Sequence, residues 1–186
     1  DLIGMGRQMI ADPSWTNKVH YGKEDTIRKC ISCNIGCSGH RIGLNRPIRC
    51  SVNPSVNEGE EYRSWKVKKP CNVVVIGGGT AGLEAACTAA EVGCTTFLIE
   101  KEDHLGGLSV EISKIPDKKR LRDFPDYLIH RAEKLRNLIT FTSTEATPSF
   151  VKMLKPDFII NATGSTPLLP PISGLRENID ASGSRV

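Results

Sequence analysis

The chain has 186 residues, a formal net charge of +4, 39% hydrophobic residues and 25% charged residues. This length allows one domain with a sizeable core plus additional segments. No apolar run is long enough to cross a membrane, none resembles a signal peptide, and apart from a short basic cluster at 118–122 the positive residues are too dispersed for a nucleic-acid-binding patch. Seven cysteines, four of them close together, argue against a secreted disulfide scaffold. They favour metal ligation in a reducing compartment, so we expect a cytoplasmic protein.

Residues 1–5 are predicted to form a strand that leads into Gly6, Arg7 and a short helical stretch before Asp12. Without further information these residues fit an ordinary surface strand and turn. The letters DLIGMGR followed by ADP resemble the end of the flavin-binding barrel in the old yellow enzyme family. In that family the glycine and arginine hold the phosphate of flavin mononucleotide (FMN). The resemblance implies that residues 1–27 are the C-terminal remnant of an FMN-binding TIM barrel, with Gly6 and Arg7 in half of the phosphate site.

Four cysteines follow in C-x2-C-x3-C-x12-C spacing: Cys30, Cys33, Cys37 and Cys50. Closely spaced thiolates on a loop reach one metal without a long loop closure, and a fourth completes a tetrahedral set. The spacing matches neither common ferredoxin pattern, so geometry alone leaves structural zinc and an iron-sulfur cluster open. The letters CISCNIGC followed by CSVNP resemble the cluster segment of the bacterial 2,4-dienoyl-CoA reductase, enoate reductase and trimethylamine dehydrogenase family. The resemblance implies that residues 28–56 bind a [4Fe-4S] cluster through these four cysteines.

Residues 57–70 are polar and charged, and we expect them to form a linker to the next domain. Cys71, Cys87 and Cys94 are predicted to be small buried or half-buried side chains without chemistry of their own. The four histidines have no partner at a recognisable spacing, which favours surface or structural roles.

A glycine-rich fingerprint lies at the centre of the sequence. Residues 73–76 are a β-branched run, typical of a strand buried on both faces of a parallel sheet. Gly77, Gly79 and Gly82 follow in G-x-G-x-x-G spacing, which suits a tight turn, the close approach of a pyrophosphate and close packing of the next helix. A second strand ends in Glu100, 18 residues after Gly82, where a carboxylate can accept hydrogen bonds from both ribose hydroxyls. These residues predict a Rossmann-like site for the adenosine diphosphate half of a dinucleotide.

Two later segments resemble parts of two-domain flavoprotein reductases. Gly106 and Gly107 resemble the glycine pair that lines the flavin side of the site, although Leu108 stands where the family usually has glutamine. The letters ATG before S-x-P resemble the motif that closes over the dinucleotide. The resemblance therefore implies that Thr163 and Gly164 lie beside the cofactor, because small residues let the backbone pass close to it.

Apolar residues between these segments recur at spacings of three and four over 117–136, which predicts an amphipathic helix that Pro125 either kinks or begins. A short strand is expected at 138–142, then a helix capped by Thr147, and then a buried strand at 157–162.

We therefore predict an α/β fold class: a Rossmann-like FAD/NAD(P)-binding half-domain with a parallel sheet at 71–167, preceded by the end of a TIM barrel and an irregular four-cysteine segment. The resemblance covers nearly the whole chain and implies an internal piece of an NADH:flavin oxidoreductase. In that family NAD(P)H reduces FAD, and electrons cross the [4Fe-4S] cluster to FMN, which reduces an activated carbon-carbon double bond of a small-molecule substrate. Residues 168–186 would cross to an NAD(P)H domain that, like the barrel, lies outside the chain, so the piece alone is expected to be inactive and no catalytic residue is assigned.

Two alternatives stay open at this point. In the trimethylamine dehydrogenase branch the electrons flow in the other direction, and ADP occupies the FAD site. From the residues alone, the chain also fits a zinc-stabilised four-cysteine knuckle joined to a non-catalytic nucleotide-binding module, or an NAD-binding dehydrogenase domain.

Overall fold

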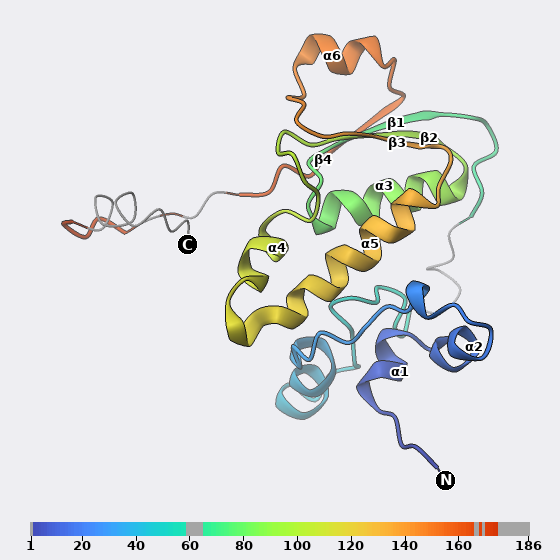
Figure 1. Ribbon diagram of the computed structural model, residues 1–186, viewed down its shortest axis with the longest axis vertical. Helices are drawn as coiled ribbons and strands as arrows, with labels where there is room; N and C mark the ends of the chain where they lie inside the picture. Colours follow the sequence, from blue (N-terminus) through green and yellow to red (C-terminus); the bar gives the residue numbers. More distant parts are fainter. Residues whose placement is uncertain (1, 59–64, 166–167, 169, 175–186) are drawn as a thin grey trace.

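The structure is a computed structural model that describes residues 2–58, 65–165, 168 and 170–174 (Figure 1). The predicted linker at 57–70 and crossover at 168–186 therefore fall partly outside the described residues. The chain begins with four short helical elements: α1 (Arg7–Ala11), α2 (Trp15–His20), the 3-10 helix η1 (Glu24–Thr26) and the π-helix η2 (Ile35–Gly43).

The strand predicted for residues 1–5 is not formed. Residues 2–6 have no regular structure, and Leu2 and Ile3 are 102% and 87% exposed. A single strand needs neighbours for its backbone hydrogen bonds, and within the described residues this stretch pairs with none. The short helix predicted to follow it is α1.

A parallel sheet of four strands forms the centre of the nucleotide-type domain. Its strands are β1 (Asn72–Ile76), β2 (Thr95–Ile99), β3 (Leu138–Phe141) and β4 (Phe158–Asn161), in the order β3-β2-β1-β4. In the central register Val74 lies opposite Phe97 on one side and Ile159 on the other. The predicted α/β class with a parallel Rossmann-like sheet is confirmed.

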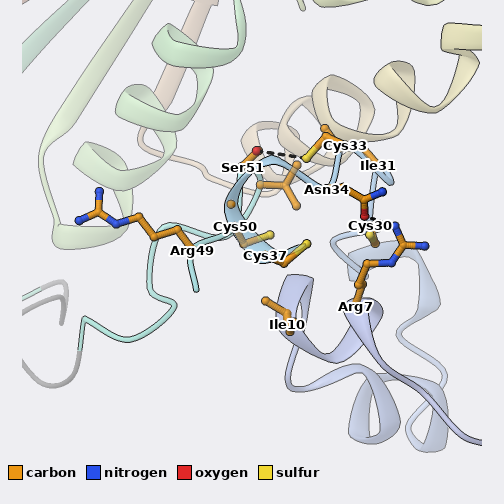
Figure 2. A pocket seen from close by; sticks show the side chains of 12 residues that line it. Arg7, Ile10, Cys30, Ile31, Cys33, Asn34, Cys37, Arg49, Cys50 and Ser51 are labelled. Atoms are coloured by element: carbon orange, nitrogen blue, oxygen red, sulfur yellow. Dashed lines mark hydrogen bonds between the residues drawn. The ribbon is translucent and has the colours of Figure 1, made fainter. Parts of the chain in front are cut away.

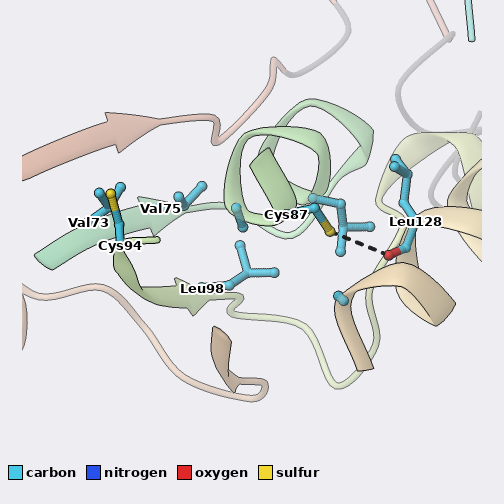
Figure 3. Packing of buried hydrophobic residues seen from close by; sticks show 9 residues of the cluster. Val73, Val75, Cys87, Cys94, Leu98 and Leu128 are labelled. Carbon is cyan, nitrogen blue, oxygen red and sulfur yellow. Dashed lines mark hydrogen bonds between the residues drawn. The ribbon is translucent and has the colours of Figure 1, made fainter. Parts of the chain in front are cut away.

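Helices cover both faces of this sheet (Figure 1). α3 (Thr80–Val92) and α5 (Asp123–Glu133) lie on one face, and α6 (Pro148–Met153) lies on the other. Successive side chains of β1 point to opposite faces, so the core has two layers. Towards α3 and α5, a cluster contains Val73, Val75, Leu83, Cys87, Leu98 and Leu128 (Figure 3). Towards α6, a smaller cluster contains Val74, Ile99 and Val151.

The amphipathic pattern over 117–136 is divided between two helices. The 3-10 helix η4 (Pro116–Arg122) follows α4 (Leu108–Ser113) and runs directly into α5. Pro125 is the third residue of α5. A proline costs no hydrogen bond there, because the first N–H groups of a helix have no partner within it. Pro125 therefore belongs to the beginning of α5, which is one of the two outcomes that the pattern allowed.

The edge strand β4 differs from its prediction. We expected a buried strand at 157–162, but Phe158, Ile159 and Ile160 are 63%, 56% and 37% exposed. β4 pairs with β1 on one side, and its other edge has no partner strand among the described residues. An apolar run predicts a strand, but it does not show that both faces are covered.

Local details agree with the sequence pattern at several places. The hydroxyl of Thr147 accepts a hydrogen bond from the Phe150 N–H (3.3 Å), which caps α6 as predicted. Cys87 and Cys94 are buried and Cys71 is half-buried. No helix among the described residues has the length and apolar character needed to cross a membrane.

Candidate functional site: a nucleotide cavity and a four-cysteine pocket

A cavity of about 560 Å³ opens at the carboxyl ends of the parallel strands. This edge is where doubly wound sheets bind ligands, and the volume suits a nucleotide-sized molecule. Loops after all four strands contribute to the lining. Six of the predicted site residues are part of it: Gly77, Gly79, Glu100, Gly107, Thr163 and Gly164.

The three fingerprint glycines differ in their surroundings. A Cβ on Gly77, whose φ is +104°, would lie 2.3 Å from the carbonyl oxygen of Ala162. A Cβ on Gly82 would lie 1.8 Å from the carbonyl oxygen of Gly77. A Cβ on Gly79 would meet nothing within 4 Å, so the space in front of this residue is open. Gly79 is also the N-cap of α3, whose unpaired N–H groups favour an anionic ligand.

Glu100 is held in place at the end of β2. The residue is only 8% exposed. Its Oε2 accepts a hydrogen bond from the Gly78 N–H (2.6 Å), and its Oε1 accepts one from the Glu102 N–H (2.9 Å). Each oxygen keeps further acceptor capacity, so the fixed carboxylate can still receive hydroxyl hydrogens from a ligand in the cavity.

The glycine pair closes against the fingerprint loop. The Gly106 N–H donates to the carbonyl oxygen of Gly78 (2.8 Å), and Gly106 forms a parallel bridge with Gly79. A Cβ on Gly107 would lie 3.0 Å from the Cα of Gly79. The pair therefore forms a wall of the cavity. Leu108 also lines it, is 57% exposed and has no hydrogen-bonding group in its side chain.

Thr163 and Gly164 complete the cavity after β4. The backbone N–H and the hydroxyl of Thr163 both donate to Asn161 Oδ1, at 3.2 and 2.9 Å. Gly164 has a φ of +75° and open space at its Cβ position. These contacts turn the chain at the end of the strand and keep its backbone beside Gly77.

The four predicted metal-ligating cysteines line a second pocket, shown in Figure 2. Ser32 and Asn34 have left-handed backbone conformations, with φ of 57° and 58°, so the chain curls around Cys33. A Cβ on Gly36 would lie 2.6 Å from the carbonyl oxygen of Arg49. This close backbone approach brings the residue after Gly36 next to the residue after Arg49, and both are cysteines: Cys37 and Cys50.

The thiols of this pocket have polar neighbours. Cys33 Sγ lies 3.2 Å from Ser51 Oγ, and Cys30 Sγ accepts a hydrogen bond from the Ser32 N–H (3.4 Å). The Cys30 N–H donates to Gln8 Oε1 (2.9 Å). Among the described residues, no three His, Cys, Asp or Glu side chains gather closely enough to hold a single metal ion. The four thiols thus surround one pocket without converging on one point.

Arg7 lies at the same pocket, whereas Gly6 does not line it. The guanidinium of Arg7 donates to Asn34 Oδ1 from within the four-cysteine loop. Gly6 is the N-cap of α1 and has open space at its Cβ position. Gly6 and Arg7, the predicted phosphate-binding pair, are adjacent in sequence. Through Asn34, Arg7 links the helix α1 to the four-cysteine loop.

Comparison with known proteins places this geometry in a family. A sequence model described as FAD dependent oxidoreductase matches residues 72–146. The chain is 44% identical to an NADH oxidase of Thermoanaerobacter brockii over 178 residues, which cover 94% of the chain and 27% of the relative. It is 34% identical to a cinnamate reductase of Clostridium sporogenes, over 94% of the chain and 26% of the relative.

Solved structures agree with this relationship. A 2-naphthoyl-CoA reductase in complex with 2-naphthoyl-CoA superimposes with a TM-score of 0.87 and 32% identity, over 94% of the chain and 26% of that protein. The chain belongs to the NADH:flavin oxidoreductase/trimethylamine dehydrogenase family. A histamine dehydrogenase of Rhizobium sp. 4-9 superimposes with a TM-score of 0.84 and 28% identity, over 93% of the chain and 26% of that protein. The chain thus spans about a quarter of the length of the relatives it matches.

Family membership confirms the resemblance on which the sequence analysis relied, while the role of each site residue stays a prediction. Several cavity residues carried no recognised motif. Thr144, Glu145 and Ala146 line the cavity after β3, and the position of a loop directly after a parallel strand is the signal that could have found them. His104 also lines it. A hydrogen bond with Asp103 (2.6 Å) raises the pKa of His104.

Proposed function

We propose that the chain is the FAD-binding and cluster-binding part of an NAD(P)H-dependent iron-sulfur flavoprotein oxidoreductase. The observation that carries this proposal is the presence, in one chain of this family, of a nucleotide cavity ending in a buried carboxylate and a second pocket lined by four thiols. The relatives named above are oxidoreductases by name. The proposed segments are a barrel remnant at 1–27, a cluster segment at 28–56, a linker at 57–70, an FAD domain at 71–167 and a crossover at 168–186.

The cavity residues suit the adenosine diphosphate half of FAD. The open space at Gly79 and the N-terminus of α3 would receive the pyrophosphate, and Glu100 would accept hydrogen bonds from the ribose hydroxyls. Gly106, Gly107, Thr163 and Gly164 would flank the rest of the cofactor. FAD, when bound, supplies the ability to accept two electrons as a hydride and to release them singly.

At the four-cysteine pocket we favour a cluster over a zinc ion, as the resemblance of this segment implies. A zinc ion holds four ligands at about 2.0–2.3 Å in one tetrahedron, which requires the thiols to converge. A [4Fe-4S] cluster is bound by four cysteines placed around a larger inorganic core, and thiols arranged around a pocket are compatible with it. The proposed ligands are Cys30, Cys33, Cys37 and Cys50, and cluster thiolates suit the reducing conditions of the cytoplasm.

The reaction of the whole protein follows from the family. Electrons from NAD(P)H would pass through FAD and the cluster to FMN, which would reduce the carbon-carbon double bond of an enoate-type or dienoyl-type substrate. Gly6 and Arg7 would belong to the FMN phosphate site, and the general acid for substrate reduction would lie outside this chain. The cinnamate reductase and the 2-naphthoyl-CoA reductase are relatives whose names fit this class of substrate.

Amine oxidation is the second candidate. The superposition with the histamine dehydrogenase favours it, because that structure matches the chain almost as well as the reductase does. In this case electrons would leave an amine through FMN and the cluster, and ADP would occupy the cavity in place of FAD. A zinc knuckle attached to a non-catalytic nucleotide module is the remaining alternative.

Cofactor analysis of the anaerobically purified chain tests the proposal. We expect about four iron and four sulfide per chain if one cluster is bound, a broad visible absorption, and tighter calorimetric binding of FAD or ADP than of NADH. Stoichiometric zinc without iron would contradict the cluster assignment, and a clear preference for NADH would contradict the flavoprotein assignment. Binding of ADP with no measurable affinity for FAD would support the amine dehydrogenase branch.

A further inference from the structure

A strip of polar residues at the start of the cluster segment and just before it lies along one side of η4 and α5. The strip consists of Asp25, Arg28, Lys29 and Ser32, which precede or interleave with the first two cysteines. Each of the four contacts one of the two helices. The contacts are Asp25 with His130 (2.8 Å) and Lys134 (2.7 Å), Arg28 with Tyr127 (3.2 Å), Lys29 with Asp123 (3.3 Å), and Ser32 with Arg120 (2.8 Å).

The spacing of these contacts is regular. The helix partners stand at 120, 123, 127, 130 and 134, which is the alternation of three and four residues that places side chains on one helical face. The order of partners is reversed along the two segments, so the strip runs antiparallel to the helix. The opposite face of α5 carries Leu128 and Ala132, which are buried against the sheet. The helix α5 therefore packs on α3 and the core with one face and on the cluster segment with the other (Figure 1).

Arg28 is the most connected member of the strip. Its Nη2 donates to the Tyr127 hydroxyl, and its guanidinium carbon lies 5.1 Å from the centre of the Tyr127 ring. Its Nη1 donates to Asn53 Oδ1 (2.8 Å), and its backbone N–H donates to Asp12 Oδ2 (2.9 Å). Asn53 and Asp12 are 3% and 4% exposed. Arg28 itself lies two residues before Cys30, and its partner Asn53 lies three residues after Cys50. Arg28 thus joins α5 to the chain on both sides of the four cysteines.

The other pairs contribute less. Lys29 and Asp123 have side chains that are 63% and 31% exposed, and exposed ion pairs of this kind contribute little to stability. Arg28 is half-buried and combines a planar fork of donors with stacking on an aromatic ring, which lysine cannot reproduce.

The beginning of α5 also packs against the glycine pair beside the nucleotide cavity. A Cβ on Gly106 would lie 3.0 Å from the Cβ of Pro125, so the glycine pair of the cavity rests on the first turn of the helix. Two residues earlier, Asp123 contacts Lys29 of the strip. One helix end thus contacts Gly106, next to the cavity-lining Gly107, and Lys29, next to Cys30.

We infer that Arg28 is a positioning residue: by anchoring the four-cysteine segment on Tyr127 of α5, it sets the position of the cysteine centre relative to the nucleotide cavity. The docking follows from the contacts alone, whereas its consequence for electron transfer rests on the proposed function. Arg28 touches neither cofactor site directly, because it lines neither the four-cysteine pocket nor the nucleotide cavity.

Hydrogen exchange on the chain without cofactors tests the docking. In the Arg28→Gln variant, amides of residues 25–33 should exchange roughly tenfold to a hundredfold faster, since hydrogen bonds to a charged group are each worth about 1.5–3 kcal/mol. Arg41→Gln is the matched control, because Arg41 donates to Asn45 inside the cluster segment (2.6 Å). Tyr127→Phe, which keeps the ring, should give a smaller change than Arg28→Gln. Equal exchange in the Arg28→Gln and Arg41→Gln variants would overturn the inference.

Electron transfer in the loaded chain tests the consequence. After photoreduction of FAD with EDTA as the electron donor, one electron should pass to the cluster and bleach its visible absorption. In Arg28→Gln this electron transfer should be on the order of tenfold slower, because a reaction between two groups loses rate when one of them is displaced by about 1 Å. Iron content, the absorption spectrum and FAD affinity should equal those of the wild type, and Arg28→Lys should restore part of the rate.

The two tests separate failure of the inference from failure of the proposed function. A wild-type rate in Arg28→Gln, with both cofactors bound, would overturn the positioning role. A wild-type chain that binds neither iron nor FAD would refute the proposed function, while hydrogen exchange would still decide whether Arg28 docks the segment.

Discussion

Two alanine substitutions in the fingerprint should separate ligand binding from folding. Gly79→Ala places a methyl group in open space, since nothing lies within 4 Å of that position. The backbone of Gly79 has φ −69° and ψ −178°, which alanine adopts without strain. Gly82→Ala places the methyl group 1.8 Å from the Gly77 carbonyl oxygen. The first change should therefore affect the ligand, and the second the fold.

The structure gives the expected magnitudes. For Gly82→Ala the clash is with backbone, so we expect the upper end of the overpacking range, about 3 kcal/mol, and a melting temperature lower by roughly 6–12 °C for a chain of this size. For Gly79→Ala we expect a change within about 0.5 kcal/mol, or roughly 2 °C. The added methyl group keeps a pyrophosphate away from the N–H groups at the start of α3. Losing one charge-assisted hydrogen bond, worth about 1.5–3 kcal/mol, should weaken ADP binding roughly tenfold to a hundredfold.

Calorimetry provides both measurements on the same samples. Differential scanning gives the melting temperature without ligand, and titration with ADP gives the dissociation constant. The reasoning is refuted if Gly79→Ala melts as early as Gly82→Ala, because the space at Gly79 would then be occupied by the protein itself. Wild-type ADP affinity in Gly79→Ala would equally show that the ligand does not approach this residue.

Three further outcomes are expected. Arg131 pairs with Glu84 (2.8 Å) and Glu91 (2.6 Å) between α5 and α3, so Arg131→Met should lower the urea unfolding free energy by about 1–2 kcal/mol, with Arg131→Lys intermediate. Hydrogen bonds from Lys134 and His130 lower the pKa of Asp25 from 3.8 to about 2. The ionised Asp25 carboxylate therefore stabilises the protein above pH 4, and this stabilisation is lost as the pH falls through about 2. An NMR titration of Asp25 should show the lowered pKa, with Lys134→Met as the control. Cys71 Sγ and Cys94 Sγ lie 2.6 Å apart, directly before the neighbouring strands β1 and β2. Oxidised glutathione should join them, raising stability by about 3 kcal/mol for a loop of this length. Burial raises the pKa of Cys94 to about 11, so the bond should form faster at pH 9 than at pH 7; peptide mapping that finds both thiols free after oxidation would contradict this expectation.

The central part of the fold could be predicted because its local and tertiary requirements coincide. The valines of 73–76 are β-branched and also buried on both faces, so propensity and packing select the same element. Gly82 is required by a backbone contact within the motif itself, 1.8 Å from the carbonyl oxygen of Gly77, and Gly77 is required by its φ of +104°. Glu100 could be located because it lies at a fixed distance along the chain, at the end of the next strand.

Other parts could not be predicted because they depend on distant neighbours. The apolar run at 158–160 forms a strand as expected, but its exposure depends on which segments lie beside an edge, and no local pattern records this. Residues 2–6 also depend on distant neighbours: their sequence is typical of a strand, but no partner strand lies beside them in the described part of the chain. For α5, the periodicity predicted the helix, but only the structure decides that Pro125 lies in its first turn.

The cysteine and glycine motifs predicted the residues of the two proposed cofactor sites separately, but not the relation of these sites to each other. That relation depends on residues such as Arg28 and Tyr127, which belong to no motif because a single polar side chain on a loop has no period and no fixed spacing to its partner. Read from the sequence alone, they resemble ordinary surface residues whose replacement should change little. The contacts give a different expectation: substitutions along this helix face should alter the coupling of the two sites while leaving each site able to bind its own ligand. Residues that hold two sites in register are therefore best sought on the element that contacts the neighbours of both, which in this chain is the first half of α5.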